Sequence, residues 1–144
     1  MTIKKFLNNK IFKSCQNVKI NWIIYTNNNA LYYENKTLKE RFTNPDYKNP
    51  NNKHIKSTIR GNLPINYWYN MKNPHSSTNK FISCSSSGKR VSSSSPFVSP
   101  PDYKNSFLKH YRFKSFEEYC NKIKRSRSDF TTIENKKNIK KIYL

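Results

Sequence analysis

The stretch Lys109–Arg125, which reads KHYRFKSFEEYCNKIKR, decides how the second half of this chain folds. Ser115 is followed three residues later by Glu118, the spacing of a capping box, in which a hydroxyl and a carboxylate each accept a hydrogen bond from a backbone N–H at a helix start. Apolar residues then recur at the i, i+3, i+4 and i+7 spacing of one helix face: Phe116, Tyr119, Cys120 and Ile123. The pattern predicts a helix that begins at Phe116, entered from a short extended piece over Phe107–Phe113.

Basic residues gather beyond this helix, in the clusters Lys122–Arg127 and Lys136–Lys141. Such clusters are typical of nuclear-localisation or nucleic-acid-binding segments, and also of a solvated tail. We interpret residues 126–144 as a basic tail and residues 1–125 as one domain.

The composition limits the size of the hydrophobic core. Only 34% of the 144 residues are hydrophobic, yet 15% are aromatic, which is more than a disordered chain carries. We therefore expect a small core. The chain has two glycines, so left-handed turns must use Asn, which tolerates a positive φ.

The formal net charge of +20 would attract any polyanion, including nucleic acid, anionic lipid and phosphorylated sugars. The cysteines are odd in number and lack C-x-x-C spacing, so we expect reduced thiols: Cys15, Cys84 and Cys120. The sequence shows neither an apolar run of membrane-spanning length nor the apolar core of a signal peptide. These features predict a soluble, cytoplasmic protein without a membrane span.

Two segments have strand character. Val18–Tyr25 is rich in β-branched and aromatic residues and ends at an Asn-rich turn, and His54–Arg60 alternates. The inward residues of the first strand are predicted to be Val18, Ile20, Trp22 and Ile24.

Shorter elements complete the prediction. Thr2 can cap a brief helix, Leu38–Phe42 suits one helical turn, and Asn44–Asn52 is typical of a loop. Periodicity fails between Leu63 and Ser106, where the Ser-rich segment 83–95 is predicted to be a mobile loop.

The order of these segments resembles one enzyme family across nearly all of residues 1–125. The matching segments are Phe6-Leu7 with Phe12 and Cys15, Val18–Tyr25, Leu38–Phe42, Lys53–Arg60, Asn73-Pro74-His75 and His110–Arg125. Together they resemble the carboxyl-terminal half of a nucleotide-sugar glycosyltransferase of the GT-A type, in the group of glycosyltransferase family 92 and its family-2-like relatives. The resemblance implies an α/β fold that is a partial GT-A fold, with few strands, short helices and long loops.

In that family the nucleotide-binding half and its metal-binding D-x-D precede the segment that resembles Thr2–Cys15. The complete family enzyme is expected to use Mn or Mg, which neutralises the leaving diphosphate. This chain has eight acidic residues and no D-x-D. We therefore expect no metal on this chain alone, and activity only if a separate chain supplies the nucleotide-binding half.

The resemblance also indicates where acceptor or donor phosphate could bind. The turn after the first strand, with Asn27 and Asn28, is a candidate for hydroxyl recognition, since ligands gather beyond strand carboxyl ends. Arg41 could bind a phosphate or carboxylate, or could equally pair with Glu34 or Glu40. His110, and more weakly His75, could touch the diphosphate. His110 could also complete a metal site with a partner segment, or be a surface histidine.

The leading hypothesis is thus a fragment of an enzyme that transfers sugar from a nucleotide-sugar donor to a glycan acceptor, inactive alone. The alternative is a small basic nucleic-acid-binding protein, whose Tyr and Phe side chains would stack on bases. A third hypothesis is a chain that forms no stable core.

Overall fold

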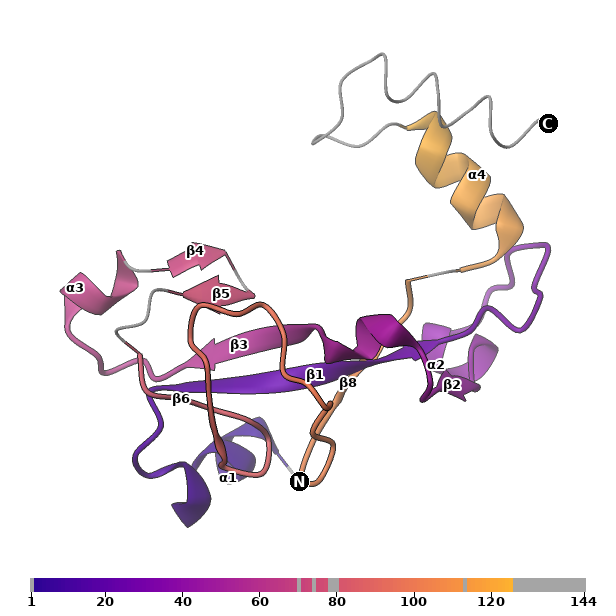
Figure 1. Ribbon diagram of the computed structural model, residues 1–144. Coiled ribbons are helices and arrows are strands. Elements are labelled where there is room, and N and C mark those ends of the chain that lie inside the picture. Colours follow the sequence, from indigo (N-terminus) through magenta and orange to yellow (C-terminus); the bar gives the residue numbers. More distant parts are fainter. Residues whose placement is uncertain (1, 70, 74, 78–80, 113, 126–144) are drawn as a thin grey trace. The chain divides into compact units, whose positions relative to one another are not determined.

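The computed structural model of the chain describes residues 2–125 except 70, 74, 78–80 and 113 (Figure 1). It divides into two compact units, of which the first comprises 1–24 and 47–110. The second comprises 25–46 together with the residues from 111 onward. The predicted basic tail, residues 126–144, lies outside the described residues.

The first unit contains most of the strands. Its elements are α1 (Ile3–Leu7), η1 (Lys10–Phe12), β1 (Asn17–Tyr25, whose last residue belongs to the second unit), η2 (Pro50–Lys53), β3 (Ile55–Ile59), α3 (Ile65–Trp68), β4 (Met71–Asn73), β5 (Ser76–Ser77), β6 (Ser83–Cys84), β7 (Arg90–Val91) and β8 (Leu108–His110). The second unit contains α2 (Leu38–Arg41), β2 (Pro45–Asp46) and α4 (Phe116–Lys124). The predicted loop over Asn44–Asn52 thus holds two short elements, β2 and the start of η2.

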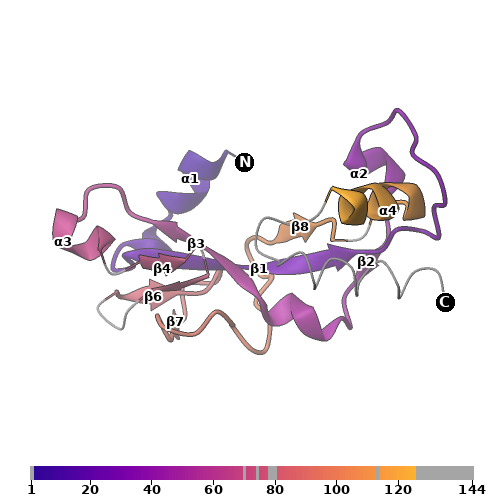
Figure 2. The ribbon, with the colours of Figure 1, turned by 90° about the horizontal axis from the view of Figure 1, so that it is seen from above.

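The main sheet is mixed and is built around β1. The strand β3 runs antiparallel to β1, with Asn17 opposite Ile59 and Asn21 opposite Ile55. Both β6 and β8 run parallel to β1 (Figures 1 and 2). In the pairing with β8, Trp22 lies opposite Leu108. With β2 and β7 the sheet has six strands among the described residues, and β4 and β5 pair separately. The predicted α/β class is confirmed.

All three predicted helices are present, and each begins at a side-chain cap. Thr2 caps α1, and a Thr37–Glu40 capping box starts α2. In the predicted box of α4, Ser115 Oγ accepts from Glu118 N at 3.3 Å and Glu118 Oε2 accepts from Ser115 N at 3.2 Å. The apolar stripe of α4 is not buried, however, since Phe116 is 51% and Tyr119 44% exposed.

Ser115→Ala is expected to lower the free energy of unfolding by about 1–2 kcal/mol, because the buried Ser115 hydroxyl caps the start of α4. The first N–H groups of this helix also donate hydrogen bonds to the carbonyls of Ala30 and Leu31. Chemical denaturation followed by circular dichroism measures the change. The exposed Ser14 provides a matched control, and Ser14→Ala should leave stability unchanged. Equal stability of the two variants would show that the box does not stabilise the native state.

The two faces of β1 are buried in different ways. One face packs into an apolar cluster with α1 and η1, made of Phe6, Phe12, Cys15, Val18, Ile20 and Cys84. The other face is polar, yet Asn17, Lys19 and Asn21 are each 0% exposed. The prediction that Trp22 is a buried inward residue is wrong, because Trp22 is half-buried.

The Ser-rich segment covers the polar face of β1. Lys19 Nζ donates to the carbonyl oxygens of Ser92, Ser93 and Ser95 at 2.8, 2.8 and 2.6 Å. Burial lowers the pKa of Lys19 to about 8, while the three carbonyls favour its charged form. The segment 83–95, predicted to be a mobile loop, includes the short strands β6 and β7, and several of its serines are buried: Ser83, Ser85, Ser86 and Ser93.

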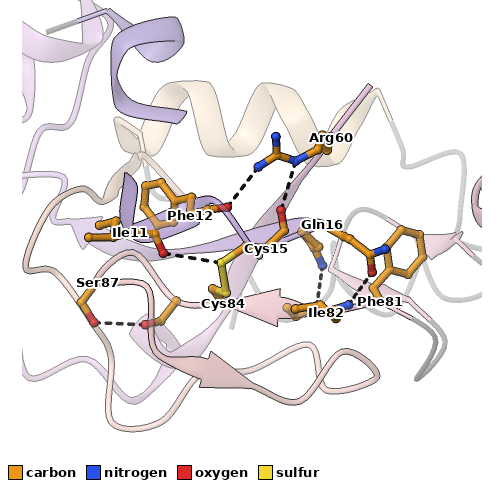
Figure 3. Close-up of a disulfide and its surroundings, with 12 residues drawn as sticks. Ile11, Phe12, Cys15, Gln16, Arg60, Phe81, Ile82, Cys84 and Ser87 are labelled. Atoms are coloured by element: carbon orange, nitrogen blue, oxygen red, sulfur yellow. Dashed lines mark hydrogen bonds between the residues drawn. A yellow bond between two sulfur atoms is a disulfide. The ribbon is translucent and has the colours of Figure 1, made fainter. Parts of the chain in front are cut away.

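Two of the three cysteines form a disulfide, so the expectation of three reduced thiols is wrong. Cys15 and Cys84, which form the bridge, are 69 residues apart in sequence (Figure 3). Cys120 is free. The fold brings the pair together because β6 runs beside β1 with Cys84 opposite Val18. Sequence spacing carries no trace of this pairing, which depends on strand register.

Side chains around the disulfide fix both of its ends. Arg60 donates from Nε to the Cys15 carbonyl at 3.2 Å and from Nη2 to the Phe12 carbonyl at 3.0 Å (Figure 3). Gln16 Oε1 accepts from Ile82 N at 2.8 Å, two residues before Cys84.

Among the described residues, no helix has the length and apolar character that crossing a membrane requires.

Candidate functional site

The indole of Trp22, in the first unit, is surrounded by three imidazoles. His54 stacks on it with ring centroids 5.0 Å apart and an interplanar angle of 16°. The ring of His75 meets it edge-on at 5.5 Å, and that of His110 lies tilted at 4.0 Å. All four side chains are half-buried, so the cluster is reachable from solvent.

Strand pairing positions these rings. Trp22 N donates to the His54 carbonyl at 3.0 Å, which aligns the start of β3 with the middle of β1. On the other side of β1, His110 is the residue of β8 opposite Ile24. His75 lies between β4 and β5, where its backbone N–H donates to Asn73 Oδ1 at 2.8 Å. The site therefore unites residues that are far apart in sequence.

A lysine completes the cluster. Lys56 Nζ lies 3.3 Å from His75 Nε2 and 5.9 Å from the centroid of the Trp22 ring. Because an ammonium can only donate, His75 Nε2 accepts this bond, and the imidazole then carries its proton on Nδ1. That nitrogen lies 2.5 Å from the Ile55 carbonyl, to which it donates. The ammonium is thus held between an imidazole and an indole face, on an exposed side chain with N–H donors to spare.

Comparisons with family models, with curated proteins and with solved structures find no match for this chain.

The predicted site residues fall into two groups. His75 and His110 meet at Trp22 in the first unit, whereas Asn27, Asn28 and Arg41 belong to the second unit. The Asn-rich turn forms as predicted, with φ of 52° at Asn28 and 56° at Asn29.

The polar groups of that turn take part in bonds within the second unit. Asn27 Oδ1 accepts from Asn29 N at 3.3 Å, and Asn28 Nδ2 donates to the Arg41 carbonyl at 3.0 Å. These bonds explain the shape of the turn without a ligand. Hydroxyl recognition by Asn27 and Asn28 stays a prediction.

Arg41 pairs with a partner that the sequence did not suggest. Its Nη2 lies 2.5 Å from Glu118 Oε2, so the predicted ion pair with Glu34 or Glu40 is replaced by one with Glu118. The Arg41 side chain is 3% exposed and that of Glu118 17%. The bond from Arg41 holds the pKa of Glu118 down to about 2, against desolvation, which would raise it. Arg41 thus already pairs with a carboxylate inside the second unit, and its binding of a phosphate stays a prediction.

The described residues contain no group of three or more His, Cys, Asp or Glu side chains that could hold a metal ion. Most of their carboxylates are engaged otherwise. Glu34 pairs with Lys36, Glu40 caps α2, Asp102 accepts from Ser85 and Ser87, and Glu118 binds Arg41.

Three members of the cluster are not recognisable as site residues from the sequence. The strand pattern predicts an inward position for Trp22 and places His54 and Lys56 in a strand. The resemblance did include the segment Lys53–Arg60, so the signal was present. Only the pairing of β3 with β1 turns that segment into part of a site.

Proposed function

We propose that this chain is glycosyltransferase-like and that the cluster around Trp22 binds the diphosphate of a nucleotide-sugar donor. One observation carries the proposal. The two histidines that the resemblance singled out for donor phosphate, His75 and His110, lie on the same indole, together with the positioned ammonium of Lys56. Neither composition nor periodicity required them to meet.

The chemistry of sugar transfer calls for such a cluster. The acceptor hydroxyl oxygen bonds to the anomeric carbon and releases its proton to solvent, while the bond between the anomeric carbon and the diphosphate oxygen breaks and leaves its electron pair on the diphosphate. Fixed cations and N–H donors at the departing diphosphate stabilise that developing charge. Lys56 offers N–H donors there. His54 and His110 offer imidazoles that, when protonated, can donate hydrogen bonds to the negatively charged diphosphate.

The alternative, a nucleic-acid-binding protein, makes a different prediction about this cluster. When dispersed lysines neutralise the phosphates of a nucleic acid, the affinity depends steeply on salt concentration and does not depend on one particular lysine. A diphosphate site at Trp22 should instead retain its affinity at physiological ionic strength and should depend on Lys56.

Fluorescence titration tests the proposal directly. The chain has two tryptophans, so Trp68→Phe leaves Trp22 as the sole indole reporter. In this background we expect saturable quenching by UDP or GDP and by the matching UDP- or GDP-sugar, but not by the free nucleoside. Lys56→Ala should weaken binding by about 10- to 100-fold, since a hydrogen bond to a charged group contributes about 1.5–3 kcal/mol.

Lys48→Ala is the matched control, because Lys48 is exposed, lies in the same unit and loses the same charge. It should bind like the parent. The donor-site proposal is wrong if the two lysine variants lose affinity equally. It is also wrong if single-stranded DNA displaces bound UDP or GDP at a lower concentration than the matching nucleotide-sugar needs.

A further inference from the structure

The second unit contains a large open cavity whose residues have no role in the proposed donor site. Its volume is about 740 Å³, which lies within the usual range of about 300–1,000 Å³ for small-molecule sites. Aromatic and basic side chains share its wall, among them Tyr33, Tyr111, Tyr119, Arg112, Lys122 and Arg125. The wall belongs to the helix α4, to the chain that leads into it and to the segment before α2.

Tyr33 is held as a flat platform in this cavity. Arg41 Cζ lies 5.0 Å from the centroid of the Tyr33 ring, and Arg41 is itself fixed by Glu118. The Tyr33 backbone N–H donates to Glu117 Oε2 at 2.7 Å. Although one side of the ring rests on a buried guanidinium, the residue is 55% exposed. The ring is therefore pre-positioned and still accessible for stacking.

Backbone hydrogen bonds fix the segment that carries Tyr33. The first two N–H groups of α4, on Phe116 and Glu117, donate to the carbonyls of Ala30 and Leu31 at 2.9 and 3.0 Å. The helix start would otherwise leave these N–H groups without intrahelical partners. These bonds tie the segment that carries Tyr33 to the start of α4.

The polar lining indicates a ligand that both donates hydrogen bonds and carries negative charge. Glu117, Asn121 and the Glu118 oxygen that does not bind Arg41, Oε1, can accept hydrogen bonds, which suits hydroxyl groups and disfavours a run of phosphodiesters. Lys114, Lys122 and Arg125 supply positive charge on the same wall. On α4, Tyr119 and Lys122 are three residues apart and so lie on one face, which places a ring beside a cation.

We propose that this cavity binds an acidic saccharide, with a sugar ring stacked on Tyr33 and its carboxylate or phosphate group held by the basic residues. The pyranose ring offers C–H groups to the aromatic face, and its hydroxyls donate to the carboxylates and to the amide oxygen. This proposal does not rest on the donor site at Trp22, because the two sites share no residue.

Isothermal titration of the full chain at physiological ionic strength tests the proposal with three probes. A hyaluronan tetrasaccharide supplies carboxylates, mannose 6-phosphate supplies a phosphate, and chitotetraose is the neutral reference. At least one acidic probe should bind saturably, about tenfold or more tighter than chitotetraose. Tyr33→Ala and Lys122→Ala should each weaken that binding by about tenfold or more.

Matched variants separate this site from general charge and from misfolding. Tyr32 is 74% exposed and does not line the cavity, so Tyr32→Ala should bind like the parent, as should Lys39→Ala on α2. Thermal melts should show that all four variants fold alike. Failure of both acidic probes to bind overturns the proposal. Equal losses in Lys122→Ala and Lys39→Ala, or displacement by oligothymidine at lower concentration than the saccharide, overturn it as well. UDP binding at Trp22 should be unaffected by Tyr33→Ala, so the two proposals fail independently.

Discussion

Glu118→Gln is expected to lower the free energy of unfolding by about 3–5 kcal/mol, the cost of leaving one charge of a buried pair uncompensated. The Arg41 side chain is 3% exposed and would lose its anionic partner. Glutamine is accepted at the third position of a capping box, so the substitution removes the ion pair and keeps the cap. Urea denaturation followed by circular dichroism measures the loss.

Glu34→Gln is the matched control for this variant. Glu34 pairs with Lys36 at 2.9 Å, but the two side chains are 54% and 62% exposed. An exposed pair contributes about 0–1 kcal/mol, so this change should be nearly neutral. Similar stabilities of the two variants would mean that the Arg41–Glu118 pair does not form in solution.

The same pair sets the response to acid. The folded-state pKa of Glu118 is about 2 and lies below that of the unfolded chain, so the unfolded chain binds the proton more readily. The stability that the pair contributes is therefore complete above the unfolded pKa of 4.5 and is lost as the pH falls towards 2. The stability difference between the parent and Glu118→Gln should shrink over that window.

Replacing both bridged cysteines by serine should cost about 4 kcal/mol, the chain-entropy contribution expected for a loop of this length. The disulfide closes a separation of 69 residues and lies in the apolar cluster of the first unit. Denaturation of Cys15→Ser/Cys84→Ser under oxidising conditions measures the effect. Dithiothreitol should destabilise the parent by a similar amount and leave the double variant unchanged.

Cys120→Ser is the control, because Cys120 is free and its replacement leaves the bridge intact. Thiol counting by mass spectrometry gives an independent check. Three alkylated cysteines in the native, unreduced protein would contradict the disulfide, and one would support it. A reducing compartment would remove the bridge, so the native stability should depend on where the protein resides.

Local features of the fold could be predicted from sequence, whereas long-range ones could not. The α4 helix and its Ser115–Glu118 box follow from residues within one turn of each other. The disulfide and the burial of Lys19 depend on partners about 70 or more residues away, whose identity no local pattern encodes. Lys19 in a strand would ordinarily indicate a solvent-facing position.

The candidate site divides in the same way. The family resemblance indicates His75 and His110 as site residues, because it compares several segments that are far apart in the sequence at once. Lys56 and His54 gain their meaning only when β3 pairs with β1, and Trp22 only when β8 joins on the other side. Arg41 was misjudged because its partner, Glu118, lies 77 residues further along the chain.

The polar face of β1 has a consequence for the uniqueness of the fold. Asn17, Lys19 and Asn21 alternate with apolar residues, and each is wholly buried and donates hydrogen bonds to neighbouring groups. A slip of β1 by one residue would place an ammonium and two amides among apolar side chains. The groups that now accept their hydrogen bonds would be left without donors. These three side chains therefore penalise misaligned strand pairings, so that a chain with few apolar residues can still select a single alignment.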